Sequence, residues 1–378
     1  MWPRCCGKKR ANTVVLILKV IFYSFLGAAM RKFVKGYTVM KFVKENESTV
    51  SVRTLLQSEQ FKILISDLKE FPDCPAFLLL NKFAVKMTHN FLCNTQHMTG
   101  VHQRLVAVTI DSASKREIED VWPKILQLHF PIPQLQMPFA QFLNEDRYHL
   151  FYVFRANLAL ALAFSNQSFW MMQQDTFLRK NLFRNNLESG VALLFDRNGH
   201  QFKSNRRKQF VDGANWFVRA SHKTVAFLSK FAMRLRTNYV PDAAILTMQC
   251  QLREVPDLYC SFIPYNILSS WTWLTTDQTS PPEALQIDDA AANTKLEAMK
   301  DRGLYFLADT NSKTDICNQT TVSNAQRQMA KGKIQLAKPF GLSDLFTKIG
   351  DFGLSLPLLG DLIRKYGLLG HYYYLFWR

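Results

Sequence analysis

A short apolar run that ends in polar side chains is the feature that most constrains this fold. The apolar run occupies residues 169–172, and the four residues after it are polar: Gln173, Gln174, Asp175 and Thr176. Such runs are typical of strands buried on both faces of a sheet. Because ligands of open α/β sheets collect beyond the carboxyl ends of the strands, Asp175 is the leading candidate for a functional residue. The alternative is that Asp175 only caps the next helix.

Two earlier apolar runs have the same character. Residues 76–80 precede Asn81, and residues 105–110 precede Asp111. Asn81 is therefore a second candidate for ligand contact. The segment Ser114 to Glu117 has the pattern of a capping box that starts a helix.

Helical patterns alternate with these predicted strands. Apolar residues recur at three- and four-residue steps over 146–164, which indicates a helix with one face on a sheet. We expect further strands at 191–195 and 215–218, then a helix over 221–236 that ends before a turn at Pro241-Asp242. This alternation of strands and helices indicates an α/β domain.

The positive charge of the chain is concentrated at its N-terminus. The net charge is +17, but ten Lys and Arg residues precede the first acidic residue, Glu45, which leaves +7 for the rest. No basic helix or stacking motif supports nucleic-acid recognition. We therefore do not expect a nucleic-acid partner.

Residues 12–30 are about long enough to cross a bilayer. Lys19 interrupts them at a cost of about 2.5–3.5 kcal/mol, which the surrounding apolar residues can offset. A cleavable signal peptide is the alternative, because Gly27-Ala28-Ala29 resembles a cleavage site. The sequence predicts a single membrane anchor, with residues 1–11 as a cytosolic tail and residues 31–74 as a stem.

All three N-glycosylation sequons follow the predicted span: Asn46, Asn166 and Asn318. This order favours a single-pass type II protein of the Golgi or ER membrane whose body is luminal. Five cysteines also follow the span, and in an oxidising lumen they would tend to pair. Sequence proximity favours Cys74 with Cys93 and Cys250 with Cys260. Because no Cys-x-x-Cys spacing occurs among them, a structural zinc site is not expected.

Common catalytic motifs are absent from the sequence. Asp351-Phe352-Gly353 matches the magnesium triplet of kinases, but no Gly-rich loop or His-Arg-Asp motif precedes it. The sequence also has no P-loop, dinucleotide fingerprint or Gly-x-Ser-x-Gly motif.

From Ala76 to about Leu307 the chain resembles the nucleotide-diphospho-sugar transferase family, which comprises glycosyltransferases of the GT-A fold. The following residues carry the resemblance: Asn81, Asn90 to Cys93, Tyr152 with Arg155, Gln173 to Thr176, Gly213 to Arg219, Asp242, and Gln286 to Asp288 followed by Lys295. The resemblance implies a GT-A-like, Rossmann-type mixed sheet flanked by helices over residues 75–318. Residues 319–378 would form a basic and aromatic extension.

The resemblance also implies a metal cofactor. In such enzymes an Asp-x-Asp motif holds a divalent metal against the donor diphosphate, and here Gln173 and Asp175 stand at its two acidic positions. Asp288 stands near the place where the family often has a metal-binding histidine. Carboxylate oxygens suit Mn²⁺ or Mg²⁺, which also take ligands from water and phosphate. For Asp288 the alternative is an exposed loop carboxylate.

Other roles follow from the same resemblance. Lys295 and Arg155 would contact the diphosphate, Asp242 would orient the acceptor hydroxyl or act as its base, and Trp271 and Trp273 would stack on a sugar. The full set of expected substrate-binding residues is Asn81, Arg155, Gln173, Asn215, Trp271, Trp273 and Lys295. For Arg155 the alternative is a solvated helix face, and for the tryptophans it is packing.

We therefore expect a glycosyltransferase that moves a sugar from a nucleotide-diphosphate donor to a glycan or glycoprotein acceptor, assisted by a metal at Asp175. An inactive, glycosyltransferase-like luminal binding or scaffold protein is the main alternative, which Gln173 favours. A secreted hydrolase is a more distant alternative. Binding of a nucleoside diphosphate would separate the first two.

Overall fold

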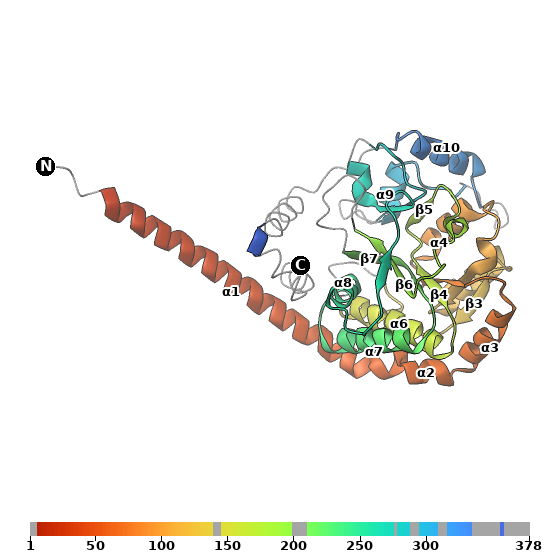
Figure 1. The fold of residues 1–378 in the computed structure, drawn as a ribbon, viewed down its shortest axis with the longest axis horizontal. Coiled ribbons are helices and arrows are strands. Elements are labelled where there is room, and N and C mark those ends of the chain that lie inside the picture. Colours follow the sequence, from red (N-terminus) through yellow and green to blue (C-terminus); the bar gives the residue numbers. More distant parts are fainter. Residues whose placement is uncertain are drawn as a thin grey trace.

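The computed structural model describes residues 6–138, 145–198, 210–275, 278–287, 295–308, 316–334 and 356–358. A seven-stranded mixed sheet lies at the centre of the α/β body (Figure 1). Its strand order is β3-β2-β1-β4-β7-β6-β8. The strands are β1 (Ala76–Leu80), β2 (Leu105–Thr109), β3 (Leu126–His129), β4 (Phe169–Met172), β6 (Leu193–Arg197), β7 (Val211–Val218) and β8 (Cys260–Phe262). Strand β7 is antiparallel to its neighbours β4 and β6, whereas the other pairs are parallel.

Helices cover both faces of this sheet. One face packs against α1 (Cys6–Asn46), α2 (Val52–Gln57), α3 (Glu59–Asp67), α6 (Glu145–Phe164), α7 (His222–Thr237) and α8 (Asp242–Leu252). The opposite face packs against α4 (Val85–Thr95) and α5 (Ser112–Val121). Successive side chains of a strand point to opposite faces, so Phe77 and Leu79 lie in the first core and Leu78 and Leu80 in the second.

The predicted strands at 76–80 and 105–110 are confirmed as β1 and β2, and the apolar run at 169–172 is β4. The predicted helix over 146–164 is confirmed as α6, but it is buried on nearly all sides. Because α1, α2 and α7 pack on its outer side, the helix lies inside the molecule rather than on its surface.

Two local predictions were wrong. Helix α5 begins at Ser112 rather than at a capping box starting with Ser114, because the Asp111 carboxylate caps it by accepting the Ser114 N–H at 2.8 Å. Pro241 and Asp242 do not form a simple turn, since Asp242 begins α8. The Asp111 side chain and the Pro241 ring each suit a turn and a helix start equally well.

A second, smaller sheet adjoins the first. It contains β5 (Thr176–Leu178), β10 (Ala284–Gln286) and β9 (Leu268–Ser270) in that order, and it packs beside α9 (Lys295–Asp301) and α10 (Gln319–Ala330). Its core includes Phe177, Trp273, Leu285, Phe306 and Met329. Because β5 starts four residues after β4 ends, the polar run at 173–176 lies at the junction of the two sheets.

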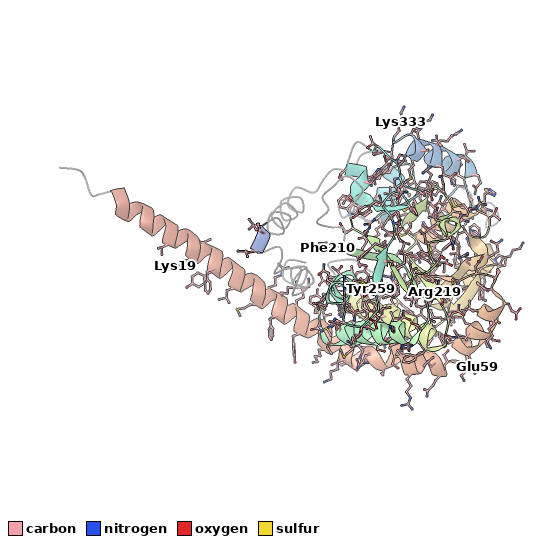
Figure 2. The ribbon with its side chains drawn as sticks, in the orientation of Figure 1. Lys19, Glu59, Phe210, Arg219, Tyr259 and Lys333 are labelled. Carbon is pink, nitrogen blue, oxygen red and sulfur yellow. A yellow bond between two sulfur atoms is a disulfide. The ribbon has the colours of Figure 1, made fainter. Side chains whose placement is uncertain are left out.

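The first part of α1 projects from the α/β body, and Lys19 lies on this projecting part (Figure 2). Among the described residues, no helix has both the length and the apolar character needed to cross a bilayer. Residues of the expected stem, including Val43, Val50 and Phe61, are buried in the main core. The packed body therefore begins before residue 75. Apart from residues 356–358, the expected extension beyond residue 334 lies outside the described residues.

The disulfides match the sequence prediction only in part. The Cys250–Cys260 pair is confirmed. The predicted Cys74–Cys93 pair was wrong: Cys93 on α4 bonds to Cys317, with 5.3 Å between Cα atoms, and Cys74 is a free thiol. The fold brings the segment before α10 next to α4, so spatial proximity overrides proximity in sequence.

Candidate active site

Asp175 lies between the two sheets, where β4 has ended and β5 is about to begin. Asp175 is 2 % exposed, and its backbone carbonyl accepts the Ile287 N–H at 2.8 Å. This bond ties the polar run to the end of β10. The helix-cap alternative for Asp175 was wrong, because a strand follows it.

Both carboxylate oxygens of Asp175 have partners. Gln286 donates to Oδ1 at 2.7 Å, and the Lys295 ammonium group contacts Oδ2. The side chain of Lys295 is 30 % exposed against 3 % for Asp175. Lys295 therefore forms the solvent-facing part of the ion pair. A ligand from solvent would reach the Asp175 carboxylate from the side of Lys295.

Gln286 connects the polar residues of both sheets. Its Oε1 accepts hydrogen bonds from Thr176 Oγ1 at 2.5 Å and from Asn215 Nδ2 at 3.1 Å. Its Nε2 lies 3.4 Å from Gln173 Oε1 as well as contacting Asp175. The amide of Gln286 is thus fixed with its nitrogen toward Asp175, and the Asp175 carboxylate is held in one position.

Asp196 on β6 is a buried acid that the sequence reasoning missed. Its carboxylate accepts the backbone N–H groups of Gly213 at 2.8 Å, Ala214 at 3.1 Å and Asn215 at 2.6 Å. Burial raises the pKa of Asp196 to about 7, against the opposing effect of these donors. The only sequence pattern that indicates a functional role for Asp196 is its position directly after the apolar residues of β6. Its role is to hold the start of β7, and with it Asn215.

Arg155, which is paired with Asp242, holds the same stretch of β7 through its carbonyls. Arg155 is 3 % exposed, and it donates to the backbone oxygens of Gly213 at 2.6 Å and Ala214 at 2.9 Å. It also donates to Asp242 Oδ2 at 3.1 Å. Burial raises the pKa of Asp242, while Arg155 acts to lower it. The predicted contacts of Arg155 and Asp242 with substrate would require this ion pair to open.

Asn81 does not join this network. Its Nδ2 donates to the carbonyls of Leu135 at 2.9 Å and Met137 at 3.0 Å, and its Oδ1 accepts the N–H groups of Phe83 and Ala84. These bonds shape the loop after β1 and tie it to the segment after β3. The amide is therefore bonded within the protein, and its contact with a ligand stays a prediction.

The remaining candidates lie beside the network or outside the described residues. Trp273 is 2 % exposed, packs in the core of the small sheet, and donates to the Thr279 carbonyl at 3.3 Å. It therefore has the packing role, whereas Trp271 stays partly exposed beside that core. Asp288 and its neighbour Asp289 lie outside the described residues.

The chain resembles known proteins both in sequence and in structure. The sequence profile described as nucleotide-diphospho-sugar transferase matches residues 100–299, which is slightly more than half of the chain. No curated protein has a sequence that matches this chain significantly.

Several solved glycosyltransferase structures resemble this chain distantly. The apo structure of the WbbM bifunctional glycosyltransferase is 9 % identical, with a TM-score of 0.40, covering 69 % of this chain and 51 % of that one. The galactosyltransferase LgtC, in complex with donor and acceptor sugar analogues, is 6 % identical, with a TM-score of 0.36 and coverages of 71 % and 99 %. The mannosyltransferase PcManGT from Pyrobaculum calidifontis, in complex with GDP-Man and Mn²⁺, is 11 % identical, with a TM-score of 0.32 and coverages of 87 % and 99 %. The chain spans about half the length of the first of these structures.

Proposed function

Because the chain belongs to the nucleotide-diphospho-sugar transferase family, we propose that it transfers a sugar from a nucleotide diphosphate to a glycan or glycoprotein acceptor at Asp175. One observation carries this proposal. Asp175 is buried at the carboxyl end of β4 and is held between Gln286 and Lys295. A fixed carboxylate beside a partly exposed cation suits a ligand that carries both phosphate oxygens and a metal ion.

Lys295 would bind the donor diphosphate. An ammonium group carries three N–H donors, so it can contact Asp175 and donate to a phosphate oxygen at the same time. Its exposed side is the side from which a donor would approach. Lys295 therefore offsets part of the negative charge that the leaving diphosphate gains.

The residues present fit a divalent metal. The Asp175 carboxylate and the Gln173 amide oxygen are hard ligands, and both contact the Gln286 side-chain nitrogen. Within the described ranges no three His, Cys, Asp or Glu side chains cluster as metal ligands, so Asp288, water and phosphate would supply the rest. A bound Mn²⁺ or Mg²⁺ would neutralise charge on the leaving group. Asp175 and Gln173 would hold it in place.

Turnover of donors tests the proposal. The full chain is incubated with a panel of UDP- and GDP-sugars, with and without Mn²⁺, and release of the nucleoside diphosphate is measured. We expect at least one donor to react, and Asp175→Asn to lower kcat by roughly 100-fold or more. Asp67→Asn, which removes an exposed carboxylate from α3, serves as the matched control. Full activity of Asp175→Asn would place the chemistry elsewhere, whereas donor binding without turnover would support a scaffold role.

We also propose that the body lies in the lumen of the Golgi or ER. The disulfides Cys93–Cys317 and Cys250–Cys260 support an oxidising compartment. Protease treatment of intact microsomes tests this placement. The body should resist digestion until detergent is added, and digestion without detergent would contradict a luminal body.

A further inference from the structure

A polar groove lies at the far end of β5 from Asp175. It has a volume of about 380 Å³ and is lined by Asn94 of α4, by His97, by residues of the 179–185 segment, by Glu283 and by one side of α10. Its volume falls within the range of known ligand sites. We call it the basic groove because of the side chains described next.

The groove has an excess of positive charge. Its lining includes Arg179, Lys180 and Arg184 against one carboxylate, Glu283, which leaves a formal charge of +2 with His97 neutral. Glu283 accepts hydrogen bonds from Lys180 at 3.0 Å and from Asn185 at 2.7 Å. The exposed Arg184 guanidinium has no hydrogen-bond or ion-pair partner within the part of the chain that the structure describes. A cation is therefore available for an anionic ligand.

Helix α10 adds a further cation to the same side. Gln319, Val322, Ser323 and Gln326 line the groove at helical spacing, and Arg327 follows Ser323 by four residues. Residues four apart lie on the same side of a helix. The exposed Arg327 therefore extends the basic edge along α10.

The walls of the groove are fixed by internal bonds. The Arg179 guanidinium donates to the carbonyl of Pro282 at 2.9 Å, and its backbone N–H donates to the Glu283 carbonyl at 2.7 Å. The Asn94 side chain exchanges two hydrogen bonds with the Leu178 backbone, at 2.9 and 2.7 Å. A site that is already ordered loses less entropy when a ligand binds.

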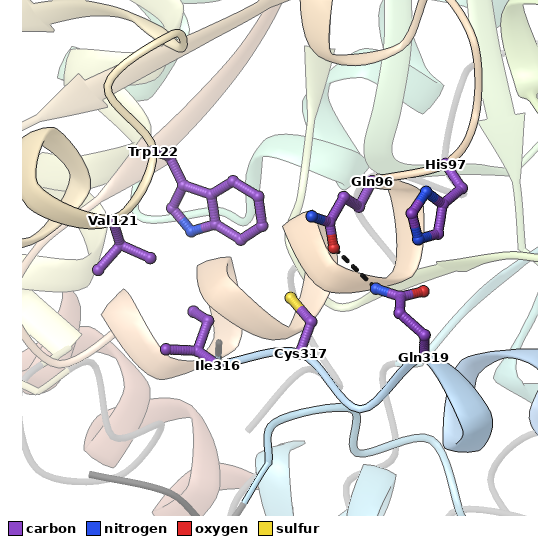
Figure 3. Close-up of a pocket in the computed structure, with 7 residues that line it drawn as sticks. All are labelled: Gln96, His97, Val121, Trp122, Ile316, Cys317 and Gln319. Atoms are coloured by element: carbon purple, nitrogen blue, oxygen red, sulfur yellow. Dashed lines mark hydrogen bonds between the residues drawn. The ribbon is translucent and has the colours of Figure 1, made fainter. Parts of the chain in front are cut away.

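A smaller cavity of about 180 Å³ adjoins the groove and shares His97 and Gln319 with it (Figure 3). The indole of Trp122 forms one side of this cavity, and the Gln96 and Gln319 amides, 2.8 Å apart, form another. An aromatic surface beside amide groups suits a sugar, because a sugar ring presents both apolar C–H faces and hydroxyl groups. The combined lining thus matches a saccharide with an anionic group.

We propose that the basic groove binds an acidic saccharide, carrying carboxylate or sulfate groups, as part of the glycan acceptor. This inference rests on the proposed glycosyl transfer. Arg179 lies four residues after Asp175, across β5, a distance of roughly 13 Å at about 3.3 Å per residue. The anionic unit is therefore remote from the hydroxyl that receives the new sugar, and the groove is separate from the donor site.

Calorimetry with defined oligosaccharides tests the inference on the full chain. The probes are a heparin-derived hexasaccharide, a hyaluronan-derived hexasaccharide and the neutral maltohexaose, at low and at physiological salt. We expect the acidic probes to bind and maltohexaose not to bind. Preference for the heparin probe would assign sulfate as the anion, whereas equal affinity for both acidic probes would assign carboxylate.

Charge-removing variants locate the binding. Arg184→Gln/Arg327→Gln should weaken binding of the acidic probe by roughly tenfold or more. The matched control is Arg53→Gln, which removes an exposed arginine from α2 at the opposite end of the body from α10 (Figure 1) and should change the affinity by less than about twofold. Equal losses in both variants, tight binding of maltohexaose, or displacement of the acidic probe by UDP would overturn the inference.

Binding of UDP is measured on the same samples. If the groove assignment fails, the double variant keeps both saccharide and UDP binding. If the donor-site assignment fails, UDP binding is absent in the wild type while the groove variants still lose the acidic probe. The two failures are therefore distinguishable.

Discussion

The ammonium group of Lys295 contacts the carboxylate of Asp175, although the two residues are 120 positions apart in the sequence. Lys295 is the first residue of α9, and Asp175 precedes β5. The contact therefore joins the small sheet to the helix beside it. It also places a cation against the acid on which the proposed chemistry depends.

Loss of the lysine should destabilise the fold. Lys295→Gln leaves the buried Asp175 carboxylate without its counter-charge, at an expected cost of about 2 kcal/mol in the free energy of unfolding. This cost is lower than for a fully buried pair, because Lys295 is 30 % exposed. Urea denaturation measures the effect.

Two further variants make this result specific. Lys295→Gln/Asp175→Asn should recover most of the lost stability, because no buried charge remains. Lys62→Gln, which removes a lysine from an exposed pair with Glu59, should cost less than about 0.5 kcal/mol. If Lys295→Gln is as stable as Lys62→Gln, the ion pair does not contribute.

The sequence named Asp175 with Gln173, Asn215 and Lys295 as candidate site residues, but not the contacts that join them. Apolar runs predicted β1, β2 and β4 because strands buried on both faces have that pattern, and Asp175 follows the last of them. The strands β5, β9 and β10 have three residues each, too few for a periodic signal. Gln286 lies on β10, so its contact with Asp175 became visible only in three dimensions.

The pH dependence of stability should reveal Asp196. Burial raises its pKa from 3.8 to about 7, so between these values the folded state binds a proton that the unfolded state has released. The contribution of Asp196 to stability is therefore greatest at low pH and falls as the pH rises from about 4 to about 7. The free energy of unfolding of wild type, relative to Asp196→Asn, should decrease over this range. A difference that stays constant, or that increases, would contradict the raised pKa.

The long-range disulfide should contribute more to stability than the free thiol does. Cys317→Ser opens a link across 224 residues and should cost about 2–5 kcal/mol. Cys74→Ser removes the free thiol and should cost less than about 1 kcal/mol. Thermal unfolding measures both variants. Non-reducing peptide mapping should recover Cys93 joined to Cys317, and a Cys74–Cys93 peptide would refute this pairing.

The cysteines and Asn81 show why some side chains could not be assigned from sequence. Cys93 bonds to a residue 224 positions away because α4 and the segment before α10 meet in space. Asn81 follows a strand at the expected edge, yet its amide bonds its own loop to the segment after β3. A strand-end position predicts where a side chain lies, but its partners depend on loops that have no periodic pattern.

Glycosylation should favour two of the three sequons. Asn166 and Asn318 are exposed, the first in the turn after α6 and the second at the start of α10. Asn46 is half-buried, and its amide nitrogen donates to the Phe42 carbonyl at 2.8 Å. Expression in a eukaryotic secretory host followed by glycosidase treatment should shift the wild type, and Asn166→Gln/Asn318→Gln should remove most of that shift. A shift that depends mainly on Asn46 would contradict this order.

Metal-dependent nucleotide binding tests the central claim that Asp175 holds a metal ion against the donor diphosphate. Calorimetry measures the affinity of UDP and GDP for the full chain with and without Mn²⁺. Wild type and the Asp67→Asn control should bind one nucleotide more tightly with Mn²⁺, and Asp175→Asn should lose that metal-dependent gain. Equal metal-dependent affinity in Asp175→Asn and wild type would contradict the assignment of Asp175.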